Sequence, residues 1–192
     1  MLHNKYYEIL KFFSEDYNRE IYGRELINKV KISQKNIALT LKELENKGIL
    51  KSKKKGNLKF YSLNLKNPQL KSYLITSEIY NKESFLINHK KLAHIFNSDD
   101  RVVGVFGSYS KNKQKKYSDV DIFIVGKKGE DYLKKGKIYD LNISVKFFTK
   151  NEFKKLLKEK NNLIKEIIEN HVLIFNVEGF INFVWRDFYG FN

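Results

Sequence analysis

The 192-residue sequence contains no cysteine, one proline and no long apolar run. The missing cysteine excludes a disulfide scaffold, a cysteine-ligated zinc site and a thiol nucleophile. No apolar stretch approaches the roughly 20 residues needed to cross a bilayer, and the N-terminus has no hydrophobic signal-peptide core. We therefore expect a soluble, cytoplasmic protein with no membrane association.

Acidic residues are also scarce, with 22 Asp and Glu against 37 Lys and Arg, and the formal net charge is +15. Residues 1–66 carry fifteen Lys or Arg and seven Asp or Glu, so they hold +8 of this charge in a third of the length. The segment from Lys47 to Lys66 has seven lysines and no acid. This distribution favours a polyanionic partner. The alternative is that the high lysine content reflects the composition of the genome.

The first third has the pattern of three helices followed by a hairpin. Ser33 is a predicted N-cap and Gly48 a predicted helix stop. Strand-like runs at 49–53 and 58–63 flank a turn at 54–57. Three stretches show apolar residues at helical spacing: Tyr6, Ile9, Leu10 and Phe13; Leu26, Ile27 and Val30; and Ile37, Leu41 and Leu44.

This order, together with the phrase from Leu41 to Leu50, resembles the winged helix-turn-helix family. The resemblance implies that the third helix enters the major groove of double-stranded DNA and that the hairpin contacts the DNA backbone. The residues it places at the base edges are Ser33, Gln34, Lys35, Asn36 and Thr40, and those it places at phosphates are Lys53, Lys54 and Lys55. Two alternatives are a solvated face of a small helical domain and a protein-docking or dimer module.

The only proline follows Asn67 and marks a boundary. We expect a winged helix at residues 1–66, a connecting helical segment at 67–97 with an interruption at Asn81-Lys82, and a second domain at 98–192. The connecting segment either packs on one domain or forms a dimer helix. In the second domain we expect helices at 151–159 and around 163–168, a strand at 171–175, and an aromatic C-terminal segment that packs on the core.

The second domain contains the motif that indicates chemistry. A buried strand at 101–107 ends in Gly107-Ser108, ten residues follow, and Asp119-Val120-Asp121 then opens an apolar strand. The two-residue period of a strand puts Asp119 and Asp121 on one face. Two carboxylates can hold Mg²⁺, which takes phosphate oxygens and water as further ligands. Ser108 is predicted to open a short helix whose N-terminus favours anions, and we expect electrostatic attraction from lysines in the intervening stretch, Lys111, Lys113, Lys115 and Lys116.

This motif resembles the minimal, single-domain branch of the DNA polymerase β-like nucleotidyltransferase superfamily, over about residues 90–176. The resemblance implies that Asp119 and Asp121 hold Mg²⁺ against ATP or another nucleoside triphosphate. It also implies that Gly107, Ser108 and Ser118 contact the nucleotide. The expected fold is α+β, with the winged helix followed by a small mixed-sheet α/β domain.

The family normally has a third carboxylate on the next strand, which we expect from Ile138 to Phe148. Along it, Leu141, Ile143, Val145 and Phe147 are expected to face one way and Asp140, Asn142, Ser144 and Lys146 to face the Asp pair. Asn142 or Ser144 takes the usual position of the third carboxylate, and only Asp140 offers an acid. Whether the chain is an enzyme therefore stays open. One hypothesis is a DNA-binding transcriptional regulator whose second domain binds Mg-nucleotide with weak or lost activity. Two-fold symmetric DNA sites favour a homodimer in this case. The other is an active nucleotidyltransferase that modifies a small molecule or, as an antitoxin, a partner toxin.

Overall fold

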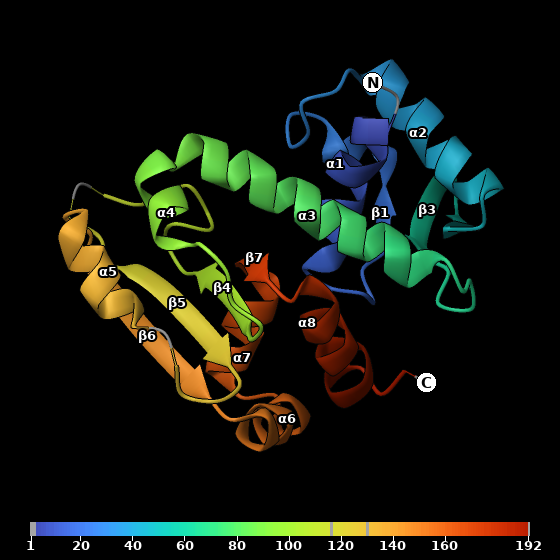
Figure 1. The fold of residues 1–192 in the computed structure, drawn as a ribbon. Coiled ribbons are helices and arrows are strands. Elements are labelled where there is room, and N and C mark those ends of the chain that lie inside the picture. The colour runs from blue at the N-terminus through green and yellow to red at the C-terminus, as the bar shows by residue number, and fades with distance from the viewer. Residues whose placement is uncertain (1–2, 116, 130, 192) are drawn as a thin grey trace. The chain divides into compact units, whose positions relative to one another are not determined.

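The computed structural model describes residues 3–115, 117–129 and 131–191 (Figure 1). The chain forms two compact units, Met1–Tyr80 and Asn81–Asn192. The first unit contains α1 (His3–Ser14), β1 (Ile21–Tyr22), the 3-10 helix η1 (Gly23–Leu26), α2 (Gln34–Asn46), β2 (Leu50–Lys55), β3 (Leu58–Leu63) and the first part of α3 (Leu70–Asn88).

The second unit starts with the last part of α3. It continues through α4 (Lys90–Ile95), β4 (Val102–Phe106), β5 (Val120–Val125), α5 (Tyr132–Ile138), β6 (Ile143–Phe148), α6 (Lys150–Glu159), α7 (Asn162–Glu169), β7 (His171–Phe175), α8 (Val177–Phe183) and the π-helix η2 (Val184–Phe188). This mixture of helices and two small sheets confirms the α+β class. In the described part of the chain, no helix is both long and apolar enough to span a membrane.

The predicted start and end of α2 are confirmed. The Ser33 hydroxyl accepts a hydrogen bond from the Asn36 backbone N–H, as an N-cap does. After the helix, Gly48 takes a positive φ of 68°, where a side chain would be strained. Ile37, Leu41 and Leu44 are buried in the core of the first unit.

The α-helix expected around Leu26, Ile27 and Val30 is wrong. Only the single 3-10 helix η1 forms there, and the chain then turns at Asn28, whose φ is 66°. Leu26 and Val30 are still buried. Because two or three apolar residues at helical spacing can also be buried by a turn, this short pattern did not identify an α-helix.

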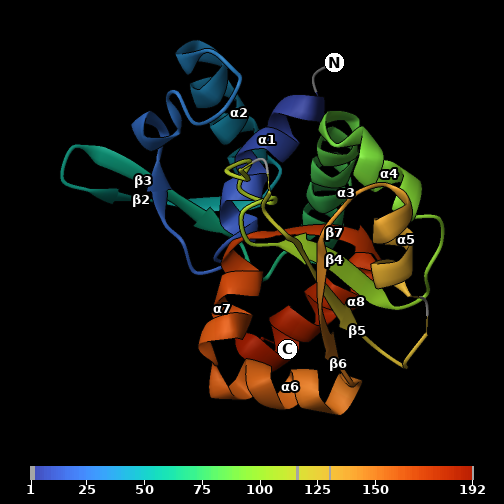
Figure 2. The ribbon, with the colours of Figure 1, turned by 90° about the vertical axis from the view of Figure 1, so that its left-hand side faces the viewer.

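The hairpin is longer than expected, since β2 continues to Lys55 and the turn consists of Gly56 and Asn57 alone. Figure 2 shows the hairpin of β2 and β3 projecting away from α1 and α2. The two-residue strand β1 pairs with β3 and completes a sheet of order β1-β3-β2. Sequence reasoning missed β1 because two residues carry no periodic signal.

The connecting helix α3 is continuous through Asn81-Lys82, and the interruption lies instead at His89, between α3 and α4. In the first unit, the Ser77 hydroxyl donates a hydrogen bond to the Tyr7 carbonyl at 3.0 Å. In the second unit, Phe85 joins the hydrophobic core. This one helix thus contributes to both cores.

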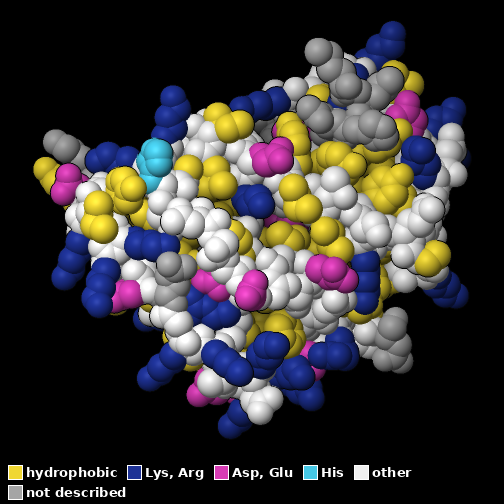
Figure 3. Space-filling view, viewed as in Figure 1, with side chains coloured by type: hydrophobic (Ala, Val, Ile, Leu, Met, Phe, Trp, Pro, Cys, Tyr) yellow, Lys and Arg dark blue, Asp and Glu magenta, His cyan; other side chains and the backbone are white. Residues whose placement is uncertain are grey.

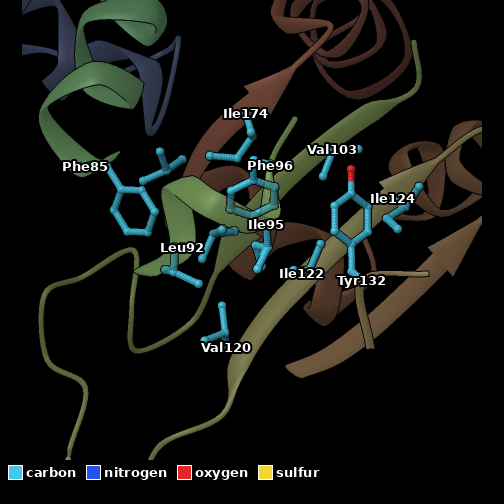
Figure 4. Close-up of a cluster of buried hydrophobic side chains, with 12 residues drawn as sticks. Phe85, Leu92, Ile95, Phe96, Val103, Val120, Ile122, Ile124, Tyr132 and Ile174 are labelled. Carbon is cyan, nitrogen blue, oxygen red and sulfur yellow. The ribbon is translucent and has the colours of Figure 1, made fainter. Parts of the chain in front are cut away.

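The sheet of the second unit has the order β6-β5-β4-β7. The central strand β4 is antiparallel to both β5 and β7, and α5 connects β5 to its parallel neighbour β6. The core on one face includes Ile122 and Ile124 of β5 together with Leu92, Ile95 and Tyr132 from the helices α4 and α5 (Figure 4). Aliphatic strand residues and helix side chains therefore close this face.

The opposite face of the sheet is aromatic. Phe123 of β5 lies 5.6 Å from the ring of Phe180 in α8, and Phe153 of α6 lies 6.2 Å from Phe180. Trp185 is also buried, so the aromatic C-terminal segment packs on the core as expected. Asp121 is on this aromatic face because it is two residues before Phe123.

We expect Gly104→Ala to destabilise the second unit. Gly104 pairs with Phe123 across the sheet, and a Cβ at position 104 would lie 2.4 Å from a Phe123 ring carbon. Because the Phe123 ring is fully buried, we expect a loss of about 1–3 kcal/mol in the free energy of unfolding, measured by urea denaturation. Gly129→Ala is the control, since its Cβ would meet Arg101 at an ordinary 3.4 Å. Equal losses in the two variants would contradict this account.

Candidate functional site

The strands β4 and β5 bring the glycine of the Gly-Ser pair against the second aspartate. Phe106 lies opposite Asp121 in the antiparallel register, and Gly107 follows with a φ of 74°. A Cβ at position 107 would lie 2.8 Å from the Asp121 Oδ2. Only glycine fits this conformation and this close approach without strain.

The two aspartates of the motif occupy different environments. Asp119 is exposed just before β5, whereas Asp121 is half-buried on the strand. They lie close enough for the Asp119 charge to raise the pKa of Asp121. The expected juxtaposition of the two carboxylates is therefore present, with one at the surface and one partly below it.

Several groups act on the Asp121 carboxylate. Burial contributes most to raising its pKa, and the charges of Asp119 and Glu166 raise it further. A hydrogen bond with Ser144 and the charge of Lys146 act in the opposite direction, and the pKa remains above the usual value. A divalent cation at this carboxylate would offset the negative charge of Asp119, Asp121 and Glu166 that Lys146 leaves uncompensated.

Glu166 is a site residue that sequence reasoning missed. It lies on α7, and its carboxylate is 3.6 Å from the Lys111 ammonium. Lys111 was expected to attract a triphosphate, but it is adjacent to this acid instead. Glu166 is forty-five residues after Asp121, and no local pattern links the two positions.

Asp140 is not where the sequence placed it. The strand β6 begins at Ile143 rather than Ile138, because Ile138 ends α5 and Asp140 then turns the chain with a φ of 51°. Asp140 is exposed in this turn. The residue opposite Asp121 in the parallel register is Ser144. The alternation predicted for this strand is confirmed, since Ile143, Val145 and Phe147 pack on the hydrophobic core.

The helix expected at Ser108 does not form. Residues 107–112 make turns, in which the Lys113 N–H donates to the Ser108 carbonyl at 2.9 Å. The Ser110 hydroxyl bonds the carbonyls of Gly107 and Asn170, both at 2.9 Å. The loop is therefore fixed by its own hydrogen bonds and by the end of α7, not by a helical turn.

Ser118, near the end of this loop, also forms a hydrogen bond within the loop. The Ser118 hydroxyl accepts a hydrogen bond from the Lys115 N–H at 2.8 Å. Lys113 and Lys115 are exposed, and Lys116 lies outside the described residues. Ser118 thus shapes the turn that precedes Asp119.

A cation here would have two protein carboxylates. Among the described residues, no group of three or more His, Cys, Asp and Glu side chains is arranged to hold a metal. Asp119 and Asp121 fit Mg²⁺, because this ion is commonly bound by one or two carboxylates together with water and substrate phosphates. The residues present therefore fit a cation that takes its remaining ligands from water and phosphate oxygens.

The first unit places its predicted DNA-contacting residues unequally on α2. Ser33, Gln34 and Lys35 are exposed and Asn36 is half-buried. Thr40, however, is only 3% exposed, so its side chain is not accessible for a base contact. The exposed face continues instead through Ala38, Leu39 and Lys42, which follow Lys35 at helical spacing. The helical spacing from Lys35 could have indicated that Lys42, and not Thr40, lies on the exposed face of α2.

The three predicted lysines of the hairpin, Lys53, Lys54 and Lys55, are all exposed. Lys55 forms an ion pair with Glu20, and Lys59 pairs with Glu45 at 2.6 Å. The acid-free run in the sequence is thus partly neutralised by acids from elsewhere in the unit. Lys53 and Lys54 remain the stronger candidates for phosphate contacts.

Residues 90–178 match the family model described as Polymerase beta, Nucleotidyltransferase. The matched segment contains all four strands of the second sheet and the Gly-Ser and Asp-x-Asp motif. The second unit therefore contains a nucleotidyltransferase-like domain. No curated protein and no solved structure is significantly similar to the chain.

We expect Asp121→Asn to stabilise the metal-free protein at neutral pH. The raised pKa of Asp121 means that the folded state binds its proton more tightly than the unfolded state does. Stability therefore falls as pH rises from the unfolded value, about 3.9, through the folded pKa. The variant lacks this loss, so its melting temperature should exceed that of the parent at pH 7. The two melting temperatures should converge below pH 4, and a destabilised variant at pH 7 would contradict the assignment.

Proposed function

We propose that the chain is a DNA-binding regulator whose second unit binds a nucleoside triphosphate with Mg²⁺ and has weak or lost transferase activity. The observation that carries the nucleotide part is the contact between Gly107 and the Asp121 carboxylate. Because Gly107 has no side chain, the half-buried Asp121 carboxylate lies against the backbone of the Gly-Ser loop, close to the exposed Asp119. When bound, Mg²⁺ would be held by these two carboxylates and would neutralise phosphate charge.

Weak or lost activity is supported by the residue opposite Asp121. The superfamily resemblance calls for a third carboxylate on the neighbouring strand, and Ser144 stands there. A serine hydroxyl is neutral and adds no negative charge that could complete a second metal site or take a proton from the attacking hydroxyl. Lys146, on the same strand face, adds positive charge that suits phosphate binding.

One observation favours the alternative, an active nucleotidyltransferase that modifies a small molecule or a partner toxin. The Glu166 charge reaches Asp121 from α7. In this alternative, Glu166 supplies the third carboxylate from a different element and Lys111 holds it in place. The two proposals differ in whether Glu166 acts as the third carboxylate, and substitution of Glu166 tests this difference.

The DNA part of the proposal rests on the first unit, which we propose is a winged helix. Gln34, Lys35 and Lys42 are exposed on α2, and Lys53 and Lys54 are exposed on β2. The hairpin of β2 and β3 projects away from α1 and α2 (Figure 2). Gln can pair with adenine edges, while lysines neutralise phosphates. A homodimer on a two-fold symmetric site is the arrangement such a domain would use.

For the nucleotide site, we expect Asp119→Asn with Asp121→Asn to weaken Mg-dependent ATP binding at least tenfold, because the metal loses both carboxylate charges. Isothermal titration with and without Mg²⁺ measures this. Asp140→Asn is the matched control and should bind as the parent does, since Asp140 is exposed in a turn. Equal binding by the double variant and the parent would contradict the site.

A transfer assay with labelled ATP decides between the regulator and the active enzyme. The regulator proposal expects no transfer of label from ATP to the partner or small molecules tested. Transfer that is lost in Glu166→Gln and kept in Ser144→Ala would favour the active enzyme instead.

For DNA binding, we expect Lys53→Ala with Lys54→Ala to weaken affinity for all duplex sequences. Each lost phosphate contact lowers the slope of log K against log salt by about 0.9, so the slope should fall by about 2. Fluorescence anisotropy over a salt series measures it. Lys134→Ala with Lys137→Ala removes the same charge from the second unit and should leave the slope unchanged. A slope that both variants leave intact would exclude contact by the hairpin.

A further inference from the structure

The second unit has a large cleft at the opposite edge of its sheet from the two aspartates. It lies where β4 begins at Val102, β5 ends at Val125 and β6 ends, and the first residues of α6 line its wall. Its volume is about 980 Å³. Val125 lies four residues after Asp121 along β5 and six after Asp119, so the cleft is roughly 13 Å from Asp121 and roughly 20 Å from Asp119 along the strand. The cleft is therefore distinct from the site described above.

The cleft combines an apolar lining with positive charge. The half-buried Phe147 and Phe183 contribute the apolar surface, and the lining also includes Val102 and Val125, which are buried. Figure 3 shows Lys and Arg side chains gathered at the lower end of this unit, where Figure 1 places α6. Among the described residues that line the cleft, the basic ones are Arg101, Lys127, Lys128, Lys150 and Arg186 and the one acid is Asp100. Arg101 and Arg186 form ion pairs with Asp99 and Asp187, at 2.6 and 3.2 Å. Such a surface attracts an anion that also carries an apolar part.

The wall that carries Lys127 and Lys128 is held in place by hydrogen bonds of Arg101. The Arg101 guanidinium donates two hydrogen bonds to Asp99, at 2.8 and 2.6 Å, and a third to the Lys127 carbonyl at 3.1 Å. The buried Tyr132 hydroxyl also donates to Asp99 at 2.8 Å. This network fixes the start of the loop after β5. Arg101 is thus a positioning residue, and Lys127 and Lys128 are the groups that would meet a ligand.

The opposite wall is formed by α6 and α8. Lys150 and Asn151 begin α6, whose capping box is complete, with Thr149 and Glu152 bonding each other. The Asn176 side chain donates to the Asp100 carbonyl at 3.0 Å and accepts from the Gly179 N–H at 3.1 Å. These caps use local partners, so the helix ends are fixed, and Lys150 supplies the charge of this wall because Arg186 pairs with Asp187.

We propose that this cleft binds a nucleoside polyphosphate without a metal ion. A chain of phosphates matches the ammonium groups of Lys127, Lys128 and Lys150, which line the same cleft, whereas the rings of Phe147 and Phe183 suit a flat base. The volume is at the upper end of the range for small-molecule sites, about 300–1,000 Å³. Lysines supply the charge that Mg²⁺ would supply at the aspartate site. This binding is a second nucleotide function of the same unit and does not depend on the first.

The test uses the full chain with Asp119→Asn and Asp121→Asn, so that only the cleft is available, and ATP as the probe in the presence of EDTA. We expect isothermal titration to show ATP binding that Lys127→Ala with Lys128→Ala weakens at least tenfold. The matched control, Lys137→Ala with Lys158→Ala, removes the same charge from exposed positions that do not line the cleft. It should change the affinity less than twofold.

The competitors define the ligand class. Tripolyphosphate should displace ATP but bind several-fold more weakly than ATP, because it lacks the base. No binding in EDTA, or equal weakening by the two lysine pairs, would overturn the proposal. A single-stranded oligonucleotide that binds the cleft a hundredfold more tightly than ATP would also overturn it, in favour of a nucleic-acid strand. None of these results depends on whether the aspartate site binds Mg²⁺.

Discussion

The antiparallel pairing of β4 with β5 is the interaction on which the second unit depends. It places Phe123 over Gly104, which builds the aromatic face of the core, and Asp121 beside Phe106, which brings Gly107 against the carboxylate. Both contacts need a glycine on β4 or directly after it. The same register thus sets the packing of the sheet and the geometry of the candidate site.

This pairing also separates two kinds of chemistry. One edge of the sheet holds carboxylates. Burial raises the pKa of Asp121 there, so a cation beside it would stabilise its charged form. The other edge holds the basic cleft, whose loop is fixed by the Arg101 network. The strands keep the opposite charges apart, and each edge can attract its own ligand.

Sequence reasoning succeeded where a pattern was local and long enough to be read. The Ser33 cap, the apolar stripe of α2 and the alternation of β6 all depend on helix or strand periods. It failed for Leu26, Ile27 and Val30, where a turn buries two of the three apolar residues without an α-helix. The strand β6 was extended too far, since Ile138 ends α5 and β6 begins only at Ile143.

The sequence by itself determined the α+β class, the hairpin and the positions of Gly107, Asp119 and Asp121, because neighbours along the chain define each of these features. Only the tertiary structure decided that Ser144 faces Asp121, that the Glu166 charge reaches it from α7, and that Thr40 is buried. The basic cleft has the same origin, since its lining comes from β4, β5, β6, α6 and α8. Contacts between elements far apart in the chain arise from packing, and no local period encodes them.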